Sequence, residues 1–141
     1  MSLAPSLEAA YRRTTYWVDA RPQPIALRVG ERSVALDRIL ARYRMRLWAF
    51  ITAWNPRSRR CSAWCNAARQ NQLLQALRCG GYRWLPGLGE GDDSRWPAEP
   101  SFLVLGTSVL QAKRLARRFN QSAIVMGRLG GPAVLVWCGG E

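Results

Sequence analysis

Polar side chains gather where the longest apolar run of the sequence stops. The run covers residues 47–54, and Asn55-Pro56 ends it. Proline donates no backbone hydrogen bond and restrains the residue before it, so this dipeptide is typical of a strand end. Ser58 and Asn66 follow at the expected start of a helix, where free N–H groups favour an anion. The pattern indicates either a polar pocket or a local turn at Asn55 with Asn66 tying down the loop.

Four carboxylates follow in the middle of the chain, at Glu90, Asp92, Asp93 and Glu99. Such a cluster could bind a divalent cation or supply a general acid and base, with Glu99, Asp92 and Asp93 as catalytic candidates. A solvated loop is the simpler interpretation for the first three, since loops are polar by default. Glu99 differs because it lies two residues before an expected buried strand, which favours a position in a pocket.

Three further groups of residues extend this hypothesis. Gln121, at a helix-to-strand junction, is either a ligand contact or a partner of the turn at Asn120. Arg57, Arg59 and Arg60 could clamp an anion, but a solvated charge run is the more ordinary explanation. Trp54, Trp84 and Trp96 are expected to flank the pocket and could stack a base, although packing is the default. The complete set of expected ligand-binding residues is Thr52, Asn55, Ser58, Asn66, Arg69, Glu99 and Gln121, with Arg69 holding a ligand charge.

The residue inventory excludes several chemistries. The chain contains no His, which excludes Ser-His-Asp and Cys-His catalysis within one chain. Cys61 and Cys65 are four apart on an expected helix and so share a face, but their spacing is not that of a zinc site. With Cys79 and Cys138 they are expected to be buried thiols in a reducing compartment. We expect no metal, and no cofactor is evident.

The charge balance is strongly basic, at +12. Twenty of the 21 basic residues are Arg, a composition that a GC-rich genome imposes whatever the function. Residues 61–100 hold four basic and four acidic residues, so the positive charge lies in the two flanks. A basic flank raises the local concentration of any anionic partner without identifying one.

The remaining patterns predict the elements that would position these residues. Strands are expected at 16–18, 25–29, 47–54, 82–85, 101–106, 122–126 and 133–137, and helices at 7–15, from Ser33 to about Arg44, from Ser58 or Ser62 to about Cys79, and at 109–119. Residues 86–97 are expected to form a loop. This order predicts a single α+β domain over residues 1–141, with an ordered core at about 11–137. Its sheet would be mixed or mostly antiparallel, with about six to seven strands and three to four helices packed against it.

A set of short motifs spread over almost the whole chain resembles a known family. The motifs are residues 50–56 with Ser58, Asn66 with Arg69 and Leu73, Gly81-Tyr82, residues 87–93, Trp96, residues 99–101 and residues 119–123. Taken together they resemble the bacterial domain of unknown function family 3293, from about Tyr11 to Val136. The resemblance implies a structural unit and supplies no activity. Two positions depart from the family pattern: Cys65, where the family tends to have an acid, and Asn120, where it tends to have Gly.

These observations predict a small domain that binds a polar or anionic ligand, with nucleotide-like molecules among the candidates. One alternative is a hydrolase-type enzyme that uses Glu99 as a base, with Asp92 or Asp93 supporting a metal. The other is a nucleic-acid or protein interaction module that uses the basic helix 109–119. The N-terminal residues lack a basic segment followed by an apolar one, and no apolar stretch reaches the roughly 18 residues of a transmembrane helix. We therefore expect a cytoplasmic protein without membrane contact; the sequence does not predict its oligomeric state.

Overall fold

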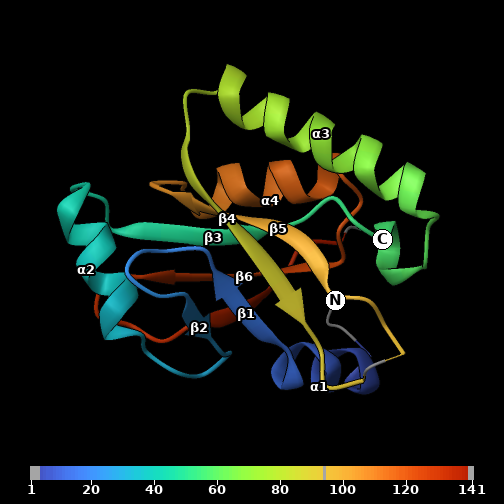
Figure 1. The fold of residues 1–141 in the computed structure, drawn as a ribbon, viewed down its shortest axis with the longest axis horizontal. Helices are drawn as coiled ribbons and strands as arrows, with labels where there is room; N and C mark the ends of the chain where they lie inside the picture. The colour runs from blue at the N-terminus through green and yellow to red at the C-terminus, as the bar shows by residue number, and fades with distance from the viewer. Residues whose placement is uncertain (1–3, 94, 140–141) are drawn as a thin grey trace.

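The computed structural model describes residues 4–93 and 95–139. Within these residues the chain forms a seven-stranded sheet and four α-helices (Figure 1), which confirms the expected single α+β domain. The helices are α1 (Pro5–Arg13), α2 (Val34–Arg42), α3 (Ala63–Cys79) and α4 (Val109–Arg118), with a short 3₁₀ turn η1 (Pro56–Ser58). The strands are β1 (Thr15–Val18), β2 (Ile25–Leu27), β3 (Leu47–Ile51), β4 (Arg83–Glu90), β5 (Glu99–Leu105), β6 (Ala123–Arg128) and β7 (Val134–Trp137).

The sheet is antiparallel and curled. Its strand order is β2-β1-β4-β5-β3-β6-β7, and each neighbouring pair runs antiparallel. The two edges meet at one point, because Val29 after β2 forms a parallel bridge with Ala133 before β7. The Gly30 N–H donates to the Ala133 carbonyl at 2.8 Å, and the Ala133 N–H donates to the Glu31 carbonyl at 3.0 Å. The sheet is therefore a half-barrel with a concave and a convex face.

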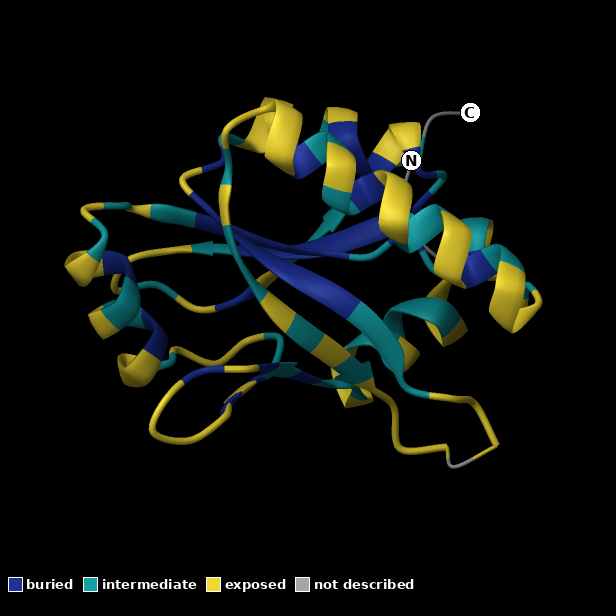
Figure 2. Cartoon of the chain, turned by 45° about the horizontal axis from the view of Figure 1, so that its top comes forward, coloured by how far each residue is buried: buried dark blue, intermediate teal, exposed yellow. Residues whose placement is uncertain are grey.

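Both faces of the central strands are covered, because successive side chains of a strand point to opposite faces. On β3, Ala49 and Ile51 belong to the core formed with α3 and α4. Trp48 and Phe50 belong to the second core, which also contains Leu36 and Leu40 of α2. Figure 2 shows the buried central strands between helices whose outer faces are exposed. The central strand is therefore covered on both sides.

Serine side chains cap the starts of α2, α3 and α4, whereas α1 has no side-chain cap. The hydroxyl groups of Ser33, Ser62 and Ser108 accept hydrogen bonds from backbone N–H groups in the first turns of α2, α3 and α4. Each side chain therefore satisfies one of the N–H groups that a helix start leaves free. Gly81, after α3, has φ +70°, as expected for the residue that reverses the chain after a helix.

Three sequence-based expectations are wrong in detail. The strand expected at 82–85 continues through the expected loop to Glu90, so the loop begins only at Gly91. The expected strand 47–54 ends at Ile51, which frees Thr52 and its neighbours to form the loop before η1. Cys61 precedes α3 and is not on the helix with Cys65.

One end of the half-barrel collects the residues singled out from the sequence. Here β1, β5 and β6 begin while β3 and β4 end, as the pairs Thr15–Glu90 and Gly89–Glu99 show. Helix α1 lies at this end and α2 at the opposite one (Figure 1). No helix in the described ranges is long and apolar enough to span a bilayer.

Candidate functional site

Asn55 turns the chain from the end of β3 into η1. Its backbone is left-handed, with φ 46° and ψ 64°, a conformation that Asn tolerates better than most residues. The turn is closed by a hydrogen bond from the Ser58 N–H to the Asn55 carbonyl at 2.9 Å. The residue is 5% exposed, so its side chain is directed into the molecule.

The side chains of Asn55 and Asn66 form a closed set of hydrogen bonds. The Asn55 N–H donates to Asn66 Oδ1 at 2.8 Å, and Asn66 Nδ2 donates to Asn55 Oδ1 at 3.0 Å. The Cys61 N–H also donates to Asn55 Oδ1, at 2.9 Å. Asn66, in the first turns of α3, is only 2% exposed. Asn66 therefore does not line the pocket but holds Asn55, which does.

Asn55 in turn holds the side chain of Glu99, the first residue of β5. Asn55 Nδ2 donates to Glu99 Oε2 at 2.8 Å, and Trp96 Nε1 donates to the same oxygen at 3.0 Å. Hydrogen bonds to an ionised carboxylate are stronger than those between neutral groups. Within the described part of the chain, Glu99 Oε1 accepts no hydrogen bond, so one carboxylate oxygen is held by two donors and the other has no donor.

A pocket of about 400 Å³ opens at this end of the half-barrel. Its walls include five aromatic side chains, and its polar groups include most of the residues predicted from the sequence. The aromatic residues are Tyr11, Tyr16, Phe50, Trp54 and Trp96, and the predicted ones are Thr52, Asn55, Ser58, Asp92, Asp93, Glu99 and Gln121. Tyr16 and Phe50 meet edge to face, with ring centroids 5.2 Å apart.

The Tyr11 hydroxyl group lies in this pocket and reaches the Ala123 carbonyl at 3.4 Å. Burial, followed by the nearby Glu99 carboxylate, raises the pKa of Tyr11 to about 12, against a smaller opposing effect of the Ser58 hydroxyl. Burial, with a contribution from Tyr11, also raises the pKa of Tyr16 above its ordinary value. Both phenols are therefore protonated at neutral pH and act as neutral hydrogen-bonding groups.

Thr52 and Gln121 line the pocket but also hold its frame together. The Thr52 hydroxyl donates to the Pro100 carbonyl at 2.8 Å and accepts from the Trp54 N–H at 3.1 Å. Gln121 Nε2 donates to the carbonyls of Trp54 and Phe119, at 3.1 and 3.2 Å. These bonds join β3, β5 and the α4–β6 junction.

Arg69 does not line the pocket. From α3 its Nε donates to the Ala53 carbonyl at 3.0 Å, and its Nη2 donates to the Phe119 carbonyl. The guanidinium group therefore ties the end of β3 to the end of α4. Arg69 therefore stabilises the fold and does not place its positive charge in the pocket.

Asp92 and Asp93 lie at the exposed rim of the pocket, and each pairs with an arginine. Asp92 Oδ2 is 3.1 Å from Arg13 Nε, and Asp93 Oδ1 is 3.1 Å from Arg95 Nε. The hydrogen bonds from Arg95 lower the pKa of Asp93. No group of three or more His, Cys, Asp or Glu that could hold a metal ion occurs among the described residues.

The tryptophans expected beside the pocket divide between two sites. Trp54 and Trp96 line it, and the Arg60 guanidinium lies over the Trp96 ring at 5.1 Å from the centroid. Trp84, by contrast, packs edge to face on Phe102 in the core formed with α3 and α4, so its predicted place beside the pocket is wrong.

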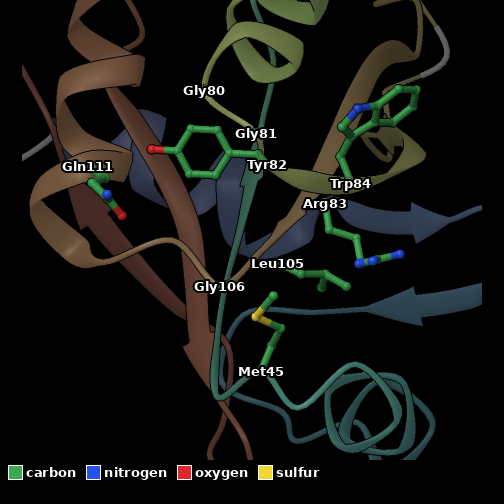
Figure 3. Close-up of a pocket in the computed structure, with 9 residues that line it drawn as sticks. All are labelled: Met45, Gly80, Gly81, Tyr82, Arg83, Trp84, Leu105, Gly106 and Gln111. Atoms are coloured by element: carbon green, nitrogen blue, oxygen red, sulfur yellow. The ribbon is translucent and has the colours of Figure 1, made fainter.

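A second hollow, of about 560 Å³, lies elsewhere on the molecule (Figure 3). It is more open, and its lining contains no carboxylate. Figure 3 shows Tyr82 and Gln111 on one side and Met45 on the other. Arg83 at its edge is already engaged, with its guanidinium 4.5 Å from the Tyr43 ring centroid. The hollow therefore lacks the converging polar groups of the first pocket.

The sequence analysis missed Tyr11, Tyr16 and Phe50 as pocket residues. Each was assigned to a helix or strand, but none was placed near the others. Their convergence depends on the curl of the sheet and on the position of α1, neither of which leaves a periodic signal in the sequence. A two-residue alternation along 15–18 identifies a buried Tyr16 but not the cavity that it faces.

The fold and the site define a small α+β half-barrel domain with an aromatic pocket around one anchored carboxylate. A family model described as "Protein of unknown function (DUF3293)" matches residues 51–124, more than half of the chain. The chain therefore belongs to the DUF3293 family. The matched segment contains Asn55, Asn66, Glu99 and Gln121. Searches among curated proteins and among solved structures found no match.

Proposed function

We propose that this domain binds a small ligand that presents an N–H donor group, neutral or cationic, on a flat apolar body. The observation that carries the proposal is the Glu99 carboxylate. Asn55 and Trp96 hold its Oε2, its Oε1 accepts no hydrogen bond from the described residues, and Glu99 lines the pocket. A partly buried acceptor of this kind gains most from a ligand that donates to it, because an unpaired charge in such a place is costly.

The size and the walls of the pocket support a flat ligand. Its volume of about 400 Å³ falls in the usual range for small-molecule sites, roughly 300–1,000 Å³. The rings of Trp54, Trp96, Tyr16 and Phe50 supply apolar surface, and aromatic faces also attract cations.

The sign of the local charge argues against an anionic ligand. The lining contains three carboxylates, from Asp92, Asp93 and Glu99. Asp92 pairs with Arg13 and Asp93 with Arg95, while Glu99 forms no ion pair with the described residues. Arg69, the cation expected from the sequence to hold a ligand charge, donates to backbone carbonyls outside the lining. Of a nucleotide-like molecule, the base would therefore suit the pocket better than the phosphate.

Three matched probes test this proposal. Benzamidine, benzamide and benzoate share one ring and differ in the charge of the head group, being cationic, neutral and anionic. Binding to the full chain is measured by saturation-transfer NMR. We expect benzamidine to bind most tightly, benzamide more weakly and benzoate least. Preference for benzoate would overturn the assignment of a donor-bearing ligand, and equal binding of all three would show that Glu99 does not read the head group.

A second candidate function is supported by a separate surface, the outer face of α4. Arg114, Arg117 and Arg118 are exposed and Lys113 is half-buried, and within the described residues none of them forms an ion pair. Such a row of cations suits nucleic-acid phosphates. The test is fluorescence anisotropy with a labelled RNA or DNA duplex at increasing salt. We expect Lys113→Glu with Arg114→Glu to weaken binding and flatten its salt dependence, while Arg38→Glu on α2 has no effect. Binding that ignores both salt and charge reversal would remove this candidate.

A further inference from the structure

The thiols of Cys61 and Cys65 lie against each other beside the pocket floor. Their sulfur atoms are 3.4 Å apart, with the Cys65 thiol donating to Cys61 Sγ. Both residues are half-buried, so small reagents have access to the pair. Cys65 is in the first turn of α3, whereas Cys61 precedes the capping residue Ser62. One sulfur is therefore fixed by a helix and the other is on the loop that precedes it.

The other two thiols have different surroundings. Cys79 is exposed at the end of α3, and Cys138 is fully buried with its thiol directed at the Val136 carbonyl at 3.4 Å. Burial raises the pKa of Cys138 to about 11, which keeps this thiol protonated and unreactive. Among the described residues neither makes a hydrogen bond to another thiol. The chain thus provides an exposed single thiol and a buried single thiol as internal controls.

We propose that Cys61 and Cys65 are an oxidation site, closed to a disulfide by a peroxide, and that closure is felt at the Asn55–Glu99 contact in the pocket. One thiolate attacks a peroxide oxygen and breaks the O–O bond; the sulfur becomes a sulfenic acid and, for hydrogen peroxide, one water leaves. The second thiol then attacks that sulfur, the S–S bond forms and a second water leaves. Two thiols and one peroxide thus give one disulfide and two waters.

The geometry makes this closure accessible. The two sulfurs must approach from 3.4 Å to the bond length of about 2.05 Å. The shift can be taken up by Cys61, which is outside the helical hydrogen-bond ladder. A thiol reductant reverses the reaction by exchange, so the site can cycle.

Closure is coupled to the pocket through the backbone of Cys61. Its N–H donates to Asn55 Oδ1 at 2.9 Å, and its carbonyl accepts from Asn66 Nδ2 at 3.4 Å. The same Asn55 side chain holds Glu99 through its other end. A displacement of Cys61 therefore alters the bonds that orient Glu99. This inference does not depend on which ligand the pocket binds.

The oxidation itself is tested by peptide mapping of the full chain. The protein is treated with hydrogen peroxide, its remaining thiols are blocked with N-ethylmaleimide under denaturing conditions, and it is cut with trypsin. Cleavage after Arg60 and Arg69 places both cysteines in peptide 61–69, while Cys79 and Cys138 fall in other peptides. We expect peptide 61–69 without maleimide and two hydrogens lighter, and with two maleimides when dithiothreitol is added first. The Cys79→Ser variant should behave identically.

Two results would overturn the site. One is a peptide 61–69 that carries two maleimides while Cys79 is oxidised. The other is a peptide 61–69 recovered as sulfinic or sulfonic acid without a disulfide. The coupling is read from the side-chain amide signals of Asn55 and Asn66 in ¹H–¹⁵N spectra. We expect both to shift on oxidation, while the signal of Asn71, exposed on α3, stays in place. A disulfide that forms without moving the Asn55 and Asn66 signals would contradict the coupling.

Discussion

Replacing Asn55 with aspartate tests the contact between Asn55 and Glu99 by the change of one group. In the native protein Asn55 Nδ2 lies 2.8 Å from Glu99 Oε2, and the substitution puts an oxygen where this donor was. Aspartate, like asparagine, tolerates the left-handed backbone found here, at φ 46°, and keeps the oxygen that accepts from Cys61 and Asn66. The change therefore isolates the bond to Glu99 from the turn itself.

The magnitude follows from two effects. A hydrogen bond to a charged group contributes about 1.5–3 kcal/mol, and it is lost. Two carboxylates in contact also repel, which raises the pKa of the new carboxyl group in the folded state, and each pKa unit corresponds to about 1.4 kcal/mol. We expect Asn55→Asp to lower the free energy of unfolding by about 3–5 kcal/mol at about pH 8.

The pH dependence has a definite sign. Between the unfolded pKa of an aspartate, about 3.9, and the raised folded pKa, the folded variant holds a proton that the unfolded chain has released. Its stability therefore falls as pH rises through this window. The deficit relative to the wild type should be smallest at about pH 4 and largest at about pH 8.

Urea unfolding followed by tryptophan fluorescence measures this effect. With a slope of about 2 kcal/mol/M, the variant should unfold at a urea concentration about 1.5–2.5 M lower at about pH 8. Asn71→Asp, on the exposed face of α3, adds the same charge and should change the stability by less than about 0.5 kcal/mol. If the two variants unfold at the same midpoint at both pH values, the Asn55–Glu99 contact does not support the fold.

Substitutions at Gly87, Arg69 and Tyr11 probe the frame of the pocket, with Gly89→Ala and Arg69→Lys for comparison. Gly87→Ala places a Cβ 2.7 Å from the Phe50 ring, so it should lower the free energy of unfolding by about 1–3 kcal/mol. Gly89→Ala, whose Cβ has no atom nearer than 3.8 Å, should leave the urea midpoint unchanged. Equal midpoints for the two variants would show that Phe50 can move aside. Arg69→Met leaves two backbone carbonyls without their donor and should lower the free energy of unfolding by about 2–4 kcal/mol. Arg69→Lys should restore only part of this loss. Full restoration by Lys would argue against a contact in which one guanidinium group serves both carbonyls. Because the pKa of Tyr11 is raised to about 12, chiefly by burial, the folded state holds a proton that the unfolded chain releases above about pH 10. Stability should therefore fall between about pH 10 and 12, Tyr11→Phe should reduce that fall, and identical alkaline profiles would contradict the assignment.

The elements with strong local signals could be predicted from the sequence. Ser33, Ser62 and Ser108 each precede a helical apolar pattern, and each caps its helix. Helical spacing also places Asn66 on the same face of α3 as Leu73 and Leu77, and all three are buried. These successes share a cause, since capping and helical periodicity depend on residues only a few positions apart.

The features that were missed depend on distant contacts. Residues 86–90 read as a loop because Pro86, Gly87 and Gly89 are poor strand formers. They are a strand because β1 pairs with them on one side and β5 on the other. Position 87 is glycine because the Phe50 ring occupies the space where its side chain would lie. The half-barrel closes through one bridge between Val29 and Ala133, more than a hundred residues apart in the sequence. No local sequence pattern predicts that bridge, so the curl of the sheet that shapes the pocket could not be predicted either.

The same reasoning explains why Arg69 was expected to bind a ligand. An arginine beside two asparagines at a helix start suggests a charged site, but three-dimensional context gives its donors to the Ala53 and Phe119 carbonyls. Buried carbonyl groups need partners, and a long cationic side chain on a neighbouring helix can supply them. Sequence spacing cannot distinguish these two uses of one guanidinium group.

We propose that the Glu99 carboxylate accepts a hydrogen bond from a donor group of the ligand, and Glu99→Gln tests this contact. Glutamine keeps an oxygen for Asn55 and Trp96 but has no charge and turns a donor toward the ligand. Dissociation constants of benzamidine and benzamide are measured by NMR titration on the wild type and the variant, after urea unfolding has shown that the fold is retained. We expect benzamidine to bind at least about tenfold more weakly to the variant, about 1.4 kcal/mol, while the binding of benzamide changes by less than about twofold. Unchanged benzamidine binding in a folded Glu99→Gln protein would contradict this proposal.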